Sequence, residues 1–280
     1  MKTILIPTDF SDYSKNAAVF ALHIASQCGY NLHLFHCYHI PAVDPMMPGE
    51  MIGDLSEGIK NDSLAQLESL KKQLLDYAKA LNISVEITSS NRIGFAVEEI
   101  TEVANEMNPV LVVIGSRHRT GLQKFLSGSI IKPLLDHLQH TILIVPENRT
   151  FKDNKPKVLY ATDFNEADTD SLNKLIAFFK PFGAHIECLH IDTDNTPHIS
   201  EFELSELERN FKDKAADDTI HFDIVRADDV KEGLHAYIEK NNIDVVSTFS
   251  KKRNFLERLT ESSLSKHIAG ESDIPLIVFK

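Results

Sequence analysis

The sequence contains two copies of one pattern, and this internal repeat constrains its fold more than any other feature. The run ILIPTDFS at residues 4–11 recurs as VLYATDFN at residues 158–165, which places Asp9 and Asp163 154 positions apart. Toward the end of each copy the spacing falls to 134, so the second copy is 20 residues shorter. A repeat of this length indicates two related units rather than one large fold.

The repeat predicts two tandem domains, at residues 1–147 and 156–280, joined by a polar linker at residues 147–157. A chain of 280 residues suits two domains that each bury their own core. The extra length of the first copy falls mostly at residues 41–60, a stretch rich in Pro, Met and Gly. We interpret its methionines as an adaptable apolar flap, suited to a lid or a partner contact: Met46, Met47 and Met51.

Each copy alternates short β-rich apolar runs with helical patterns. In the first copy strands are expected near residues 3–8, 32–38, 84–88, 110–114 and 142–145, and helices near 13–28, 61–81, 95–107 and 129–138. In the second copy strands are expected near residues 158–161, 186–191, 221–225, 245–248 and 276–279. The continuous apolar run at 111–114 is typical of a strand covered on both faces. The predicted class is α/β, with a five-stranded, mostly parallel, Rossmann-like sheet in each domain and helices on both faces.

Composition narrows the range of partners. A net charge of −12 disfavours binding to a nucleic-acid backbone, because phosphates need a basic surface. The apolar runs are too short to cross a bilayer, and no export signal is visible. The three cysteines form no CxxC pair and lie in apolar segments, which indicates reduced thiols. We therefore expect a cytoplasmic protein that binds neither nucleic acid nor membrane.

Several residues of the first copy follow directly after predicted strands, where ligands bind to an open parallel sheet. Asp9 follows the first strand, Cys37 lies at the end of the second, and Gly115 follows the fourth. Because these positions converge from distant parts of the chain, together they indicate a binding site better than any one of them does. Asp9 has a second interpretation, since an Asp after a strand often caps the next helix.

A glycine-containing loop after the fourth strand suggests phosphate binding. Glycine lets backbone N–H groups approach an anion, and Gly128-Ser129 opens a predicted helix whose free N–H groups favour negative charge. Arg117 and Arg119 add positive charge to this loop of an acidic chain. The alternative is that the glycines only make a turn and that the serines only cap a helix.

These residues resemble the universal stress protein family over essentially the whole chain. Family domains open with a strand ending in Pro-Thr-Asp-Phe-Ser, as at residues 7–11, and end the second strand in Leu-His-Val, here Phe35-His36-Cys37. Nucleotide-binding members carry G-x2-G-x9-G-[ST]. This chain has the same spacing, with His in place of the second glycine: Gly115, His118, Gly128 and Ser129. The resemblance is to the tandem branch, in which two units mimic a homodimer.

The resemblance implies an adenine nucleotide alpha hydrolase-like fold and a site for ATP, accompanied by Mg²⁺, in the first domain. Pro7, Thr8 and Asp9 would belong to this site, with Asp9 meeting the adenine or ribose, and the Cys37 backbone would meet the base. The ribose and phosphates would be wrapped by Gly115, Arg117, His118, Gly128, Ser129 and Ile130. The final strands, near 142–145 and 276–279, would pair across a pseudo-twofold axis, and two chains could associate further into a homodimer.

The second copy lacks the glycines of this loop. The residues at the positions of Gly115, His118, Gly121, Gly128 and Ser129 are Phe249, Lys252, Phe255, Ser262 and Ser263. Without glycine the backbone cannot approach an anion closely. We therefore expect the second domain to be structural or to bind a protein partner.

Other kinds of site have less support in the sequence. Strand alternation places His33, Cys37 and His39 on one face, a possible zinc or copper set, but no recognised ligand spacing completes it. No nucleophile elbow of the GxSxG type is present around Ser116, and a receiver domain would need Asp where Ser89-Ser90 is expected to end the third strand. The preferred function is an ATP-binding regulator that hydrolyses ATP very slowly at most; the alternative is a stress-associated interaction protein that does not bind nucleotide.

Overall fold

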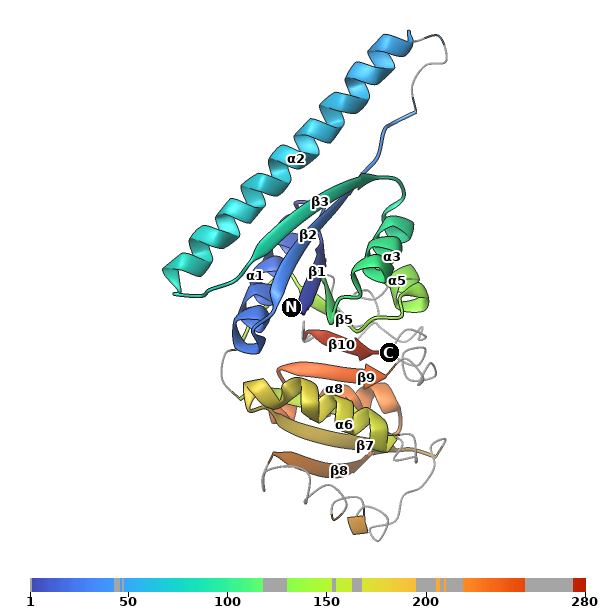
Figure 1. Cartoon of the computed structure of the whole chain (residues 1–280). Coiled ribbons are helices and arrows are strands. Elements are labelled where there is room, and N and C mark those ends of the chain that lie inside the picture. Colours follow the sequence, from blue (N-terminus) through green and yellow to red (C-terminus); the bar gives the residue numbers. More distant parts are fainter. Residues whose placement is uncertain are drawn as a thin grey trace. The chain divides into compact units, whose positions relative to one another are not determined.

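The computed structural model describes residues 2–42, 46, 48–117, 130–152, 155–162, 168–194, 205–206, 209, 219–249 and 274–280. The described chain forms two compact units, one up to residue 150 and one from residue 151 onward. Each unit is described by itself below, with the element labels of Figure 1.

The first unit contains a five-stranded sheet in which every pair of neighbours is parallel. Its strands are β1 (Thr3–Pro7), β2 (Asn31–Tyr38), β3 (Ile87–Ile93), β4 (Leu111–Ser116) and β5 (Ile142–Pro146). Their order is β3-β2-β1-β4-β5, with Ile4 opposite Leu32 on β2 and opposite Leu111 on β4. The expected α/β class with a parallel sheet is therefore confirmed.

The order of the strands determines where the helices lie. The chain runs from β1 outward to β3, returns to β4 beside β1, and continues in the opposite direction to β5. Because parallel crossovers are right-handed, this reversal sends the two sets of helices to opposite faces. Figure 1 shows α1 (Asp12–Cys28) and α2 (Gly49–Ala80) on one side of the sheet, and α3 (Ala96–Met107) and α5 (Ile131–His137) on the other. The switch point between β1 and β4 is where such sheets bind ligands.

Helix α1 packs directly on the centre of this sheet. Its N-cap is Ser11, whose side chain accepts a hydrogen bond from Ser14 N, and it ends at Gly29, which has a left-handed φ of 66°. The helix contacts β1, β4 and β5. It approaches them closely because much of its buried face is alanine: Ala17, Ala18, Ala21 and Ala25.

Helix α2 begins earlier than expected. The sequence predicted helix only from residue 61, whereas α2 spans Gly49–Ala80 and includes much of the insertion interpreted as a flap. Within the helix, burial starts only at Ser63 and continues along one face: Ser63, Leu67, Leu70, Leu74 and Ala78. Met51 is 56% exposed and Met46, before the helix, is 89% exposed. Both of these methionines are therefore exposed, and Met47 lies outside the described residues.

Strand β3 is also displaced from its expected position, residues 84–88. The strand spans Ile87–Ile93 and is mostly polar because it is an edge strand whose side chains have hydrogen-bonding partners on α2 and β2. Ser89 donates to Glu68 Oε1 at 3.2 Å and Asn91 donates to Ser63 Oγ at 2.9 Å, both on α2. Ser89-Ser90 therefore lies within the strand, and the strand ends at Ile93, which is no phosphoacceptor either.

The second unit repeats this topology. Its strands are β6 (Lys157–Ala161), β7 (His185–Asp192), β8 (Ile220–Arg226), β9 (Val245–Phe249) and β10 (Leu276–Phe279). They are parallel in the order β8-β7-β6-β9-β10, and the described helices are α6 (Asp168–Phe179), a short 3₁₀ helix (Lys180–Phe182) and α8 (Val230–Asn241). Gly183 ends the 3₁₀ helix with φ 58°, as Gly29 ends α1.

A matching histidine contact occurs in both units, part-buried in the first and buried in the second. His36 Nδ1 lies 2.7 Å from the Thr8 carbonyl oxygen, and His190 Nδ1 lies 3.0 Å from that of Thr162. In each case the histidine on the second strand of the unit reaches the residue that follows the first strand. The two copies therefore share side-chain contacts as well as strand order.

Candidate functional site

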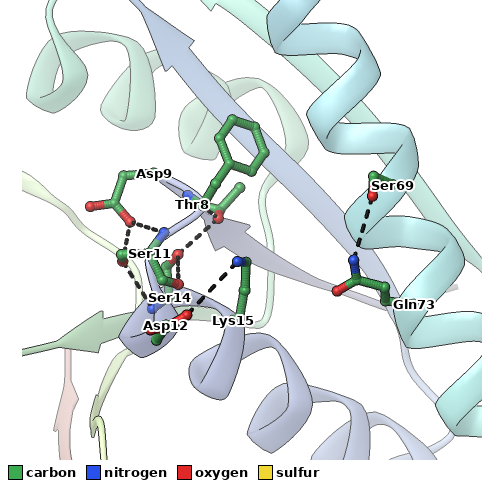
Figure 2. Close-up of polar contacts among 9 residues, drawn as sticks. Thr8, Asp9, Ser11, Asp12, Ser14, Lys15, Ser69 and Gln73 are labelled. Atoms are coloured by element: carbon green, nitrogen blue, oxygen red, sulfur yellow. Dashed lines mark hydrogen bonds and ion pairs between the residues drawn. The ribbon is translucent and has the colours of Figure 1, made fainter.

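The carboxyl end of β1 is held by its two neighbours. The Thr8 backbone N–H donates to Phe35 O on β2 at 2.8 Å, and Thr8 Oγ1 lies 3.0 Å from Ser14 Oγ on α1. Both Pro7 and Thr8 are buried. Figure 2 shows Asp9 next along the chain, directed toward the first turn of α1. The strand end therefore presents Asp9 on a rigid support.

Asp9 accepts hydrogen bonds on both carboxylate oxygens. Oδ1 accepts from the Ser11 backbone N–H at 3.1 Å and from the Ser11 hydroxyl, and Oδ2 accepts from the Tyr13 hydroxyl. Partial desolvation raises the pKa of Asp9, but the hydrogen bonds from Ser11 and Tyr13 lower it more, so its pKa lies below the ordinary value. The N-cap of α1 is Ser11, so the interpretation of Asp9 as the helix cap is wrong.

Phe10 has a positive φ of 63°, which is rare for a bulky residue. Its N–H donates to Thr8 Oγ1 at 3.0 Å, and its ring centre lies 4.4 Å from that of His36. These contacts hold the turn between β1 and α1 in a conformation that costs about 1–2 kcal/mol. The turn is therefore specified by tertiary contacts rather than by local preference.

The carboxyl end of β4 lies against the same helical turn. A Cβ atom on Gly115 would lie 2.3 Å from Tyr13 O and 2.8 Å from Ser14 N, so only glycine fits there. The next residue, Ser116, is 3% exposed, and its Oγ has no partner among the described residues. Beyond it the exposed Arg117 places its guanidinium 5.6 Å from the centre of the Tyr13 ring.

The structure thus brings three expected residues to one helical turn. Asp9 accepts a hydrogen bond from the Tyr13 hydroxyl, Gly115 packs on the Tyr13 backbone, and the Arg117 guanidinium lies over the Tyr13 ring. Tyr13 is not among the site residues predicted from the sequence. The available signal was its position, four residues after Asp9 and in the first turn of the helix that follows the strand.

The other expected residues lie around this group or outside the described chain. Cys37 is half-buried on β2, in register with Arg92 on β3. Burial, with the charges of Glu99 and Glu98, raises the pKa of Cys37 to about 11, which keeps it a thiol. Ile130 is half-buried directly before α5, and its carbonyl accepts from Leu134 N at 3.1 Å. His118, Gly128 and Ser129 lie outside the described residues.

The candidate metal ligands on β2 and directly after it have other neighbours. His33 Nδ1 lies 2.8 Å from Thr88 Oγ1, and its Nε2 lies 2.7 Å from Ser90 Oγ. The ring of His39 lies 6.2 Å from that of Phe95. Across the described part of the chain, no group of three or more His, Cys, Asp or Glu residues is placed to hold a metal ion.

The second unit differs at the position of Gly115. Phe249 stands there at the end of β9, 5% exposed, and its ring stacks on that of Phe279 at 4.9 Å. Tyr160 on β6 lies edge-on to the same ring at 5.7 Å. At the end of β4 the first turn of α1 packs on Gly115, whereas at the end of β9 Phe249 forms an aromatic cluster with Phe279 and Tyr160. Lys252, Phe255, Ser262 and Ser263 lie outside the described residues.

The universal stress protein family model matches residues 1–146 and 156–280. A relative, universal stress protein MJ0531 of Methanocaldococcus jannaschii, is 30% identical over 147 residues, covering 51% of this chain and 81% of its own. The crystal structure of a universal stress protein from Archaeoglobus fulgidus shares the fold: the match covers 99% of this chain and 96% of that one, with 19% identity and a TM-score of 0.70.

A solved family protein from Arabidopsis thaliana with AMP bound is 14% identical, with a TM-score of 0.37 over 53% of this chain and 93% of its own.

No helix in the described ranges combines the length and apolarity needed to span a membrane. The matched regions include both copies of the repeat and nearly the whole chain. The chain therefore belongs to the universal stress protein family, in its tandem two-domain form.

Proposed function

We propose that the first unit binds an adenine nucleotide, expected to be ATP, and that the chain is a regulator whose interactions depend on nucleotide occupancy. One observation carries the proposal: Asp9 and Arg117, an anion and a cation from different strands, are joined through Tyr13 at the β1/β4 switch point. Ligands of open parallel sheets bind at this point. The family motif in the sequence supplies the class of ligand.

The two charged groups suit different parts of a nucleotide. An ionised Asp9 is an acceptor for a ribose hydroxyl or an adenine amino group, and its lowered pKa keeps it ionised at neutral pH. Arg117 is exposed and can donate to phosphate oxygens. Backbone N–H groups of the loop containing His118, Gly128 and Ser129 are proposed to complete the phosphate site, with Ile130 after them.

Magnesium would enter with the nucleotide. Mg²⁺ is commonly held by substrate phosphates and water with one or two carboxylates, and not by a full set of protein ligands. The described side chains are consistent with this mode, since no group of three or more potential metal ligands is found among them.

The second unit is proposed to be structural or to bind a protein partner. The proposed nucleotide site in the first unit needs a glycine at position 115, where a side chain would meet backbone atoms. In the second unit the buried ring of Phe249 fills the equivalent position. An expected stoichiometry of one nucleotide per chain follows. The proposed location is the cytoplasm, and the protein partner, whether another protein or a second copy of the chain, would respond to the occupied first unit.

Regulation rather than catalysis is the better fit for the described side chains. A general base works best with a pKa near neutrality, and the pKa of Asp9 is displaced in the opposite direction. A nucleophilic cysteine needs a lowered pKa, and that of Cys37 is raised to about 11. We therefore propose that any ATP hydrolysis is very slow.

A second candidate is an interaction protein that does not bind nucleotide. It is favoured by the contact at Gly115, because packing against Tyr13 requires glycine whether or not a nucleotide binds. Exposed apolar side chains at the start of α2, Met51 and Leu55, are also consistent with protein contacts.

Calorimetric titration of the full chain with ATP, ADP and AMP, with and without Mg²⁺, tests the proposal. Wild-type protein is expected to bind about one nucleotide per chain. Asp9→Asn and Arg117→Gln should each weaken binding about tenfold, from the loss of one charged hydrogen bond. Asp163→Asn, the matched change in the second copy, should leave affinity unchanged. Wild-type protein that binds none of the three nucleotides would favour the interaction protein, and two nucleotides per chain would refute the assignment of the second unit.

A further inference from the structure

Tyr13 contacts both charged residues of the candidate site with different parts of one side chain. Its hydroxyl donates to Asp9 Oδ2, while its ring lies 5.6 Å below the Arg117 guanidinium. It is half-buried in the first turn of α1, and its backbone packs against Gly115 on β4. Its backbone is therefore fixed by the sheet, and its side chain reaches across the switch point.

Each contact adds a restraint to a charged side chain at the exposed surface of the unit. Asp9 is on the exposed side of its turn, where the Tyr13 hydroxyl donates to its Oδ2 and Ser11 donates to its Oδ1. Arg117 has a long exposed side chain, and a cation over an aromatic face is held by the ring quadrupole. Restraining such groups before a ligand arrives reduces the entropy lost on binding.

The two contacts also support one another. Burial and the bond to Asp9 raise the pKa of the Tyr13 hydroxyl, so it remains a protonated donor at neutral pH, while the Arg117 charge acts in the opposite direction. A positive charge over the ring makes the hydroxyl a stronger donor to the carboxylate. Asp9, Tyr13 and Arg117 therefore form one connected unit.

Resting on the proposed function, we propose that Tyr13 is the positioning residue of the site, holding Asp9 with its hydroxyl for the nucleoside and Arg117 with its ring for the phosphates. The hydroxyl and the ring then serve separate parts of the ligand. Removing only the hydroxyl should affect recognition of the nucleoside, and removing the ring should affect both. A residue that only stabilised α1 would not produce this separation.

The test uses the full chain and calorimetric titration with two probes, adenosine and inorganic pyrophosphate. Tyr13→Phe keeps the ring and is expected to weaken adenosine binding about tenfold while pyrophosphate binding changes less than twofold. Tyr13→Leu removes both contacts and should also weaken pyrophosphate binding, by about two- to fivefold. Arg117→Gln is the matched control, weakening pyrophosphate binding and not adenosine binding.

A readout that needs no ligand accompanies the titrations. NMR titration of the Asp9 carboxyl carbon should show its pKa rising in Tyr13→Phe, because a hydrogen bond to the charged form is lost. Equal weakening of both probes by Tyr13→Phe, or unchanged adenosine affinity with an unchanged Asp9 pKa, overturns the role of Tyr13. Absence of nucleotide binding by the wild type instead overturns the proposed function itself, which the titration with ATP detects separately.

Discussion

Gly115 on β4 approaches the backbone of Tyr13 so closely that a Cβ atom would lie 2.3 Å from the Tyr13 carbonyl oxygen. This contact joins the end of the fourth strand to the first turn of the helix that follows the first strand. It brings the residues after both strand ends, Asp9 and Arg117, within reach of one side chain. The glycine is therefore required for the geometry of the candidate site even before any role in binding a phosphate.

Gly115→Ala is expected to destabilise the first unit by about 1–3 kcal/mol, because the methyl group meets backbone atoms that cannot move away cheaply. Urea unfolding followed by circular dichroism measures the change. Gly53→Ala is the matched control: it lies inside α2 with open space around it, and it should stabilise by about 0.5–1 kcal/mol. Equal effects of the two substitutions would contradict the close contact.

Phe249→Ala should destabilise the second unit by about 3–5 kcal/mol, since it removes the ring that stacks on Phe279 and meets Tyr160. Thermal unfolding measured by calorimetry reports the loss. Phe95→Ala is a suitable control, because that ring is 71% exposed and its loss should change stability by less than about 0.5 kcal/mol. Phe249→Ala is not expected to bind a second nucleotide. A stoichiometry of two nucleotides per chain would show that the Phe249 ring alone had blocked a site in the second unit.

The positive φ of Phe10 predicts an unusual order of stability. Phe10→Gly and Phe10→Ala both lose the contact with His36, but only alanine keeps a Cβ in the left-handed region. The glycine variant should therefore be more stable by about 1 kcal/mol. At Gln66, exposed inside α2, the order should reverse, with alanine better by about 1 kcal/mol. Chemical denaturation of the four variants checks both orders.

His33 predicts a pH dependence of the first unit. Burial lowers the pKa of His33 below its ordinary value, so the folded chain holds it neutral while the unfolded chain takes up a proton below about pH 6.5. The unfolded state then binds more protons, and stability is lost as pH falls from 6.5 toward the folded pKa. His33→Gln should reduce the loss in unfolding free energy between pH 7.5 and pH 5.

Part of that pH dependence should remain in His33→Gln. Burial also lowers the pKa of His140, whose Nδ1 has no partner among the described residues. The unfolding free energy of the double variant His33→Gln/His140→Gln should therefore change less with pH than that of either single variant over the same range. If the single and double variants all kept the wild-type dependence of unfolding free energy on pH, neither histidine would be the source of that dependence.

Most of the fold could be predicted because it depends on local patterns. The expected ranges of nine strands overlap the observed ones within about two residues at each end, since short apolar β-branched runs covered by helices are recognisable in sequence. The exception is β3. Its polar side chains are satisfied by Glu68, Ser63 and His33, partners that only the folded unit provides.

Less of the candidate site could be predicted. The sequence predicted that Asp9, Cys37 and Gly115 lie at the same edge of the sheet, because each comes at or after the carboxyl end of a parallel strand. Asp9 and Gly115 do contact one helical turn, that of Tyr13, whereas Cys37 is half-buried on β2 in register with Arg92. Of the two interpretations of Asp9, the helix cap was wrong. A sequence does not show whether the carboxylate or the serine two residues later accepts from the free N–H groups of the helix. The bridging role of Tyr13 depends on side-chain directions that pattern does not encode.

By itself the sequence determined that this chain is a tandem repeat of two parallel α/β units and which strand ends carry polar chemistry, because repeat spacing and hydrophobic periodicity are local properties. Only the tertiary structure decided that Tyr13 links Asp9 to Arg117, that packing on α1 requires a glycine at 115, and that an aromatic cluster fills the same position in the second unit. The reason is physical: these features depend on distances of a few ångströms between segments far apart in the chain, which arise only when helix and sheet pack together.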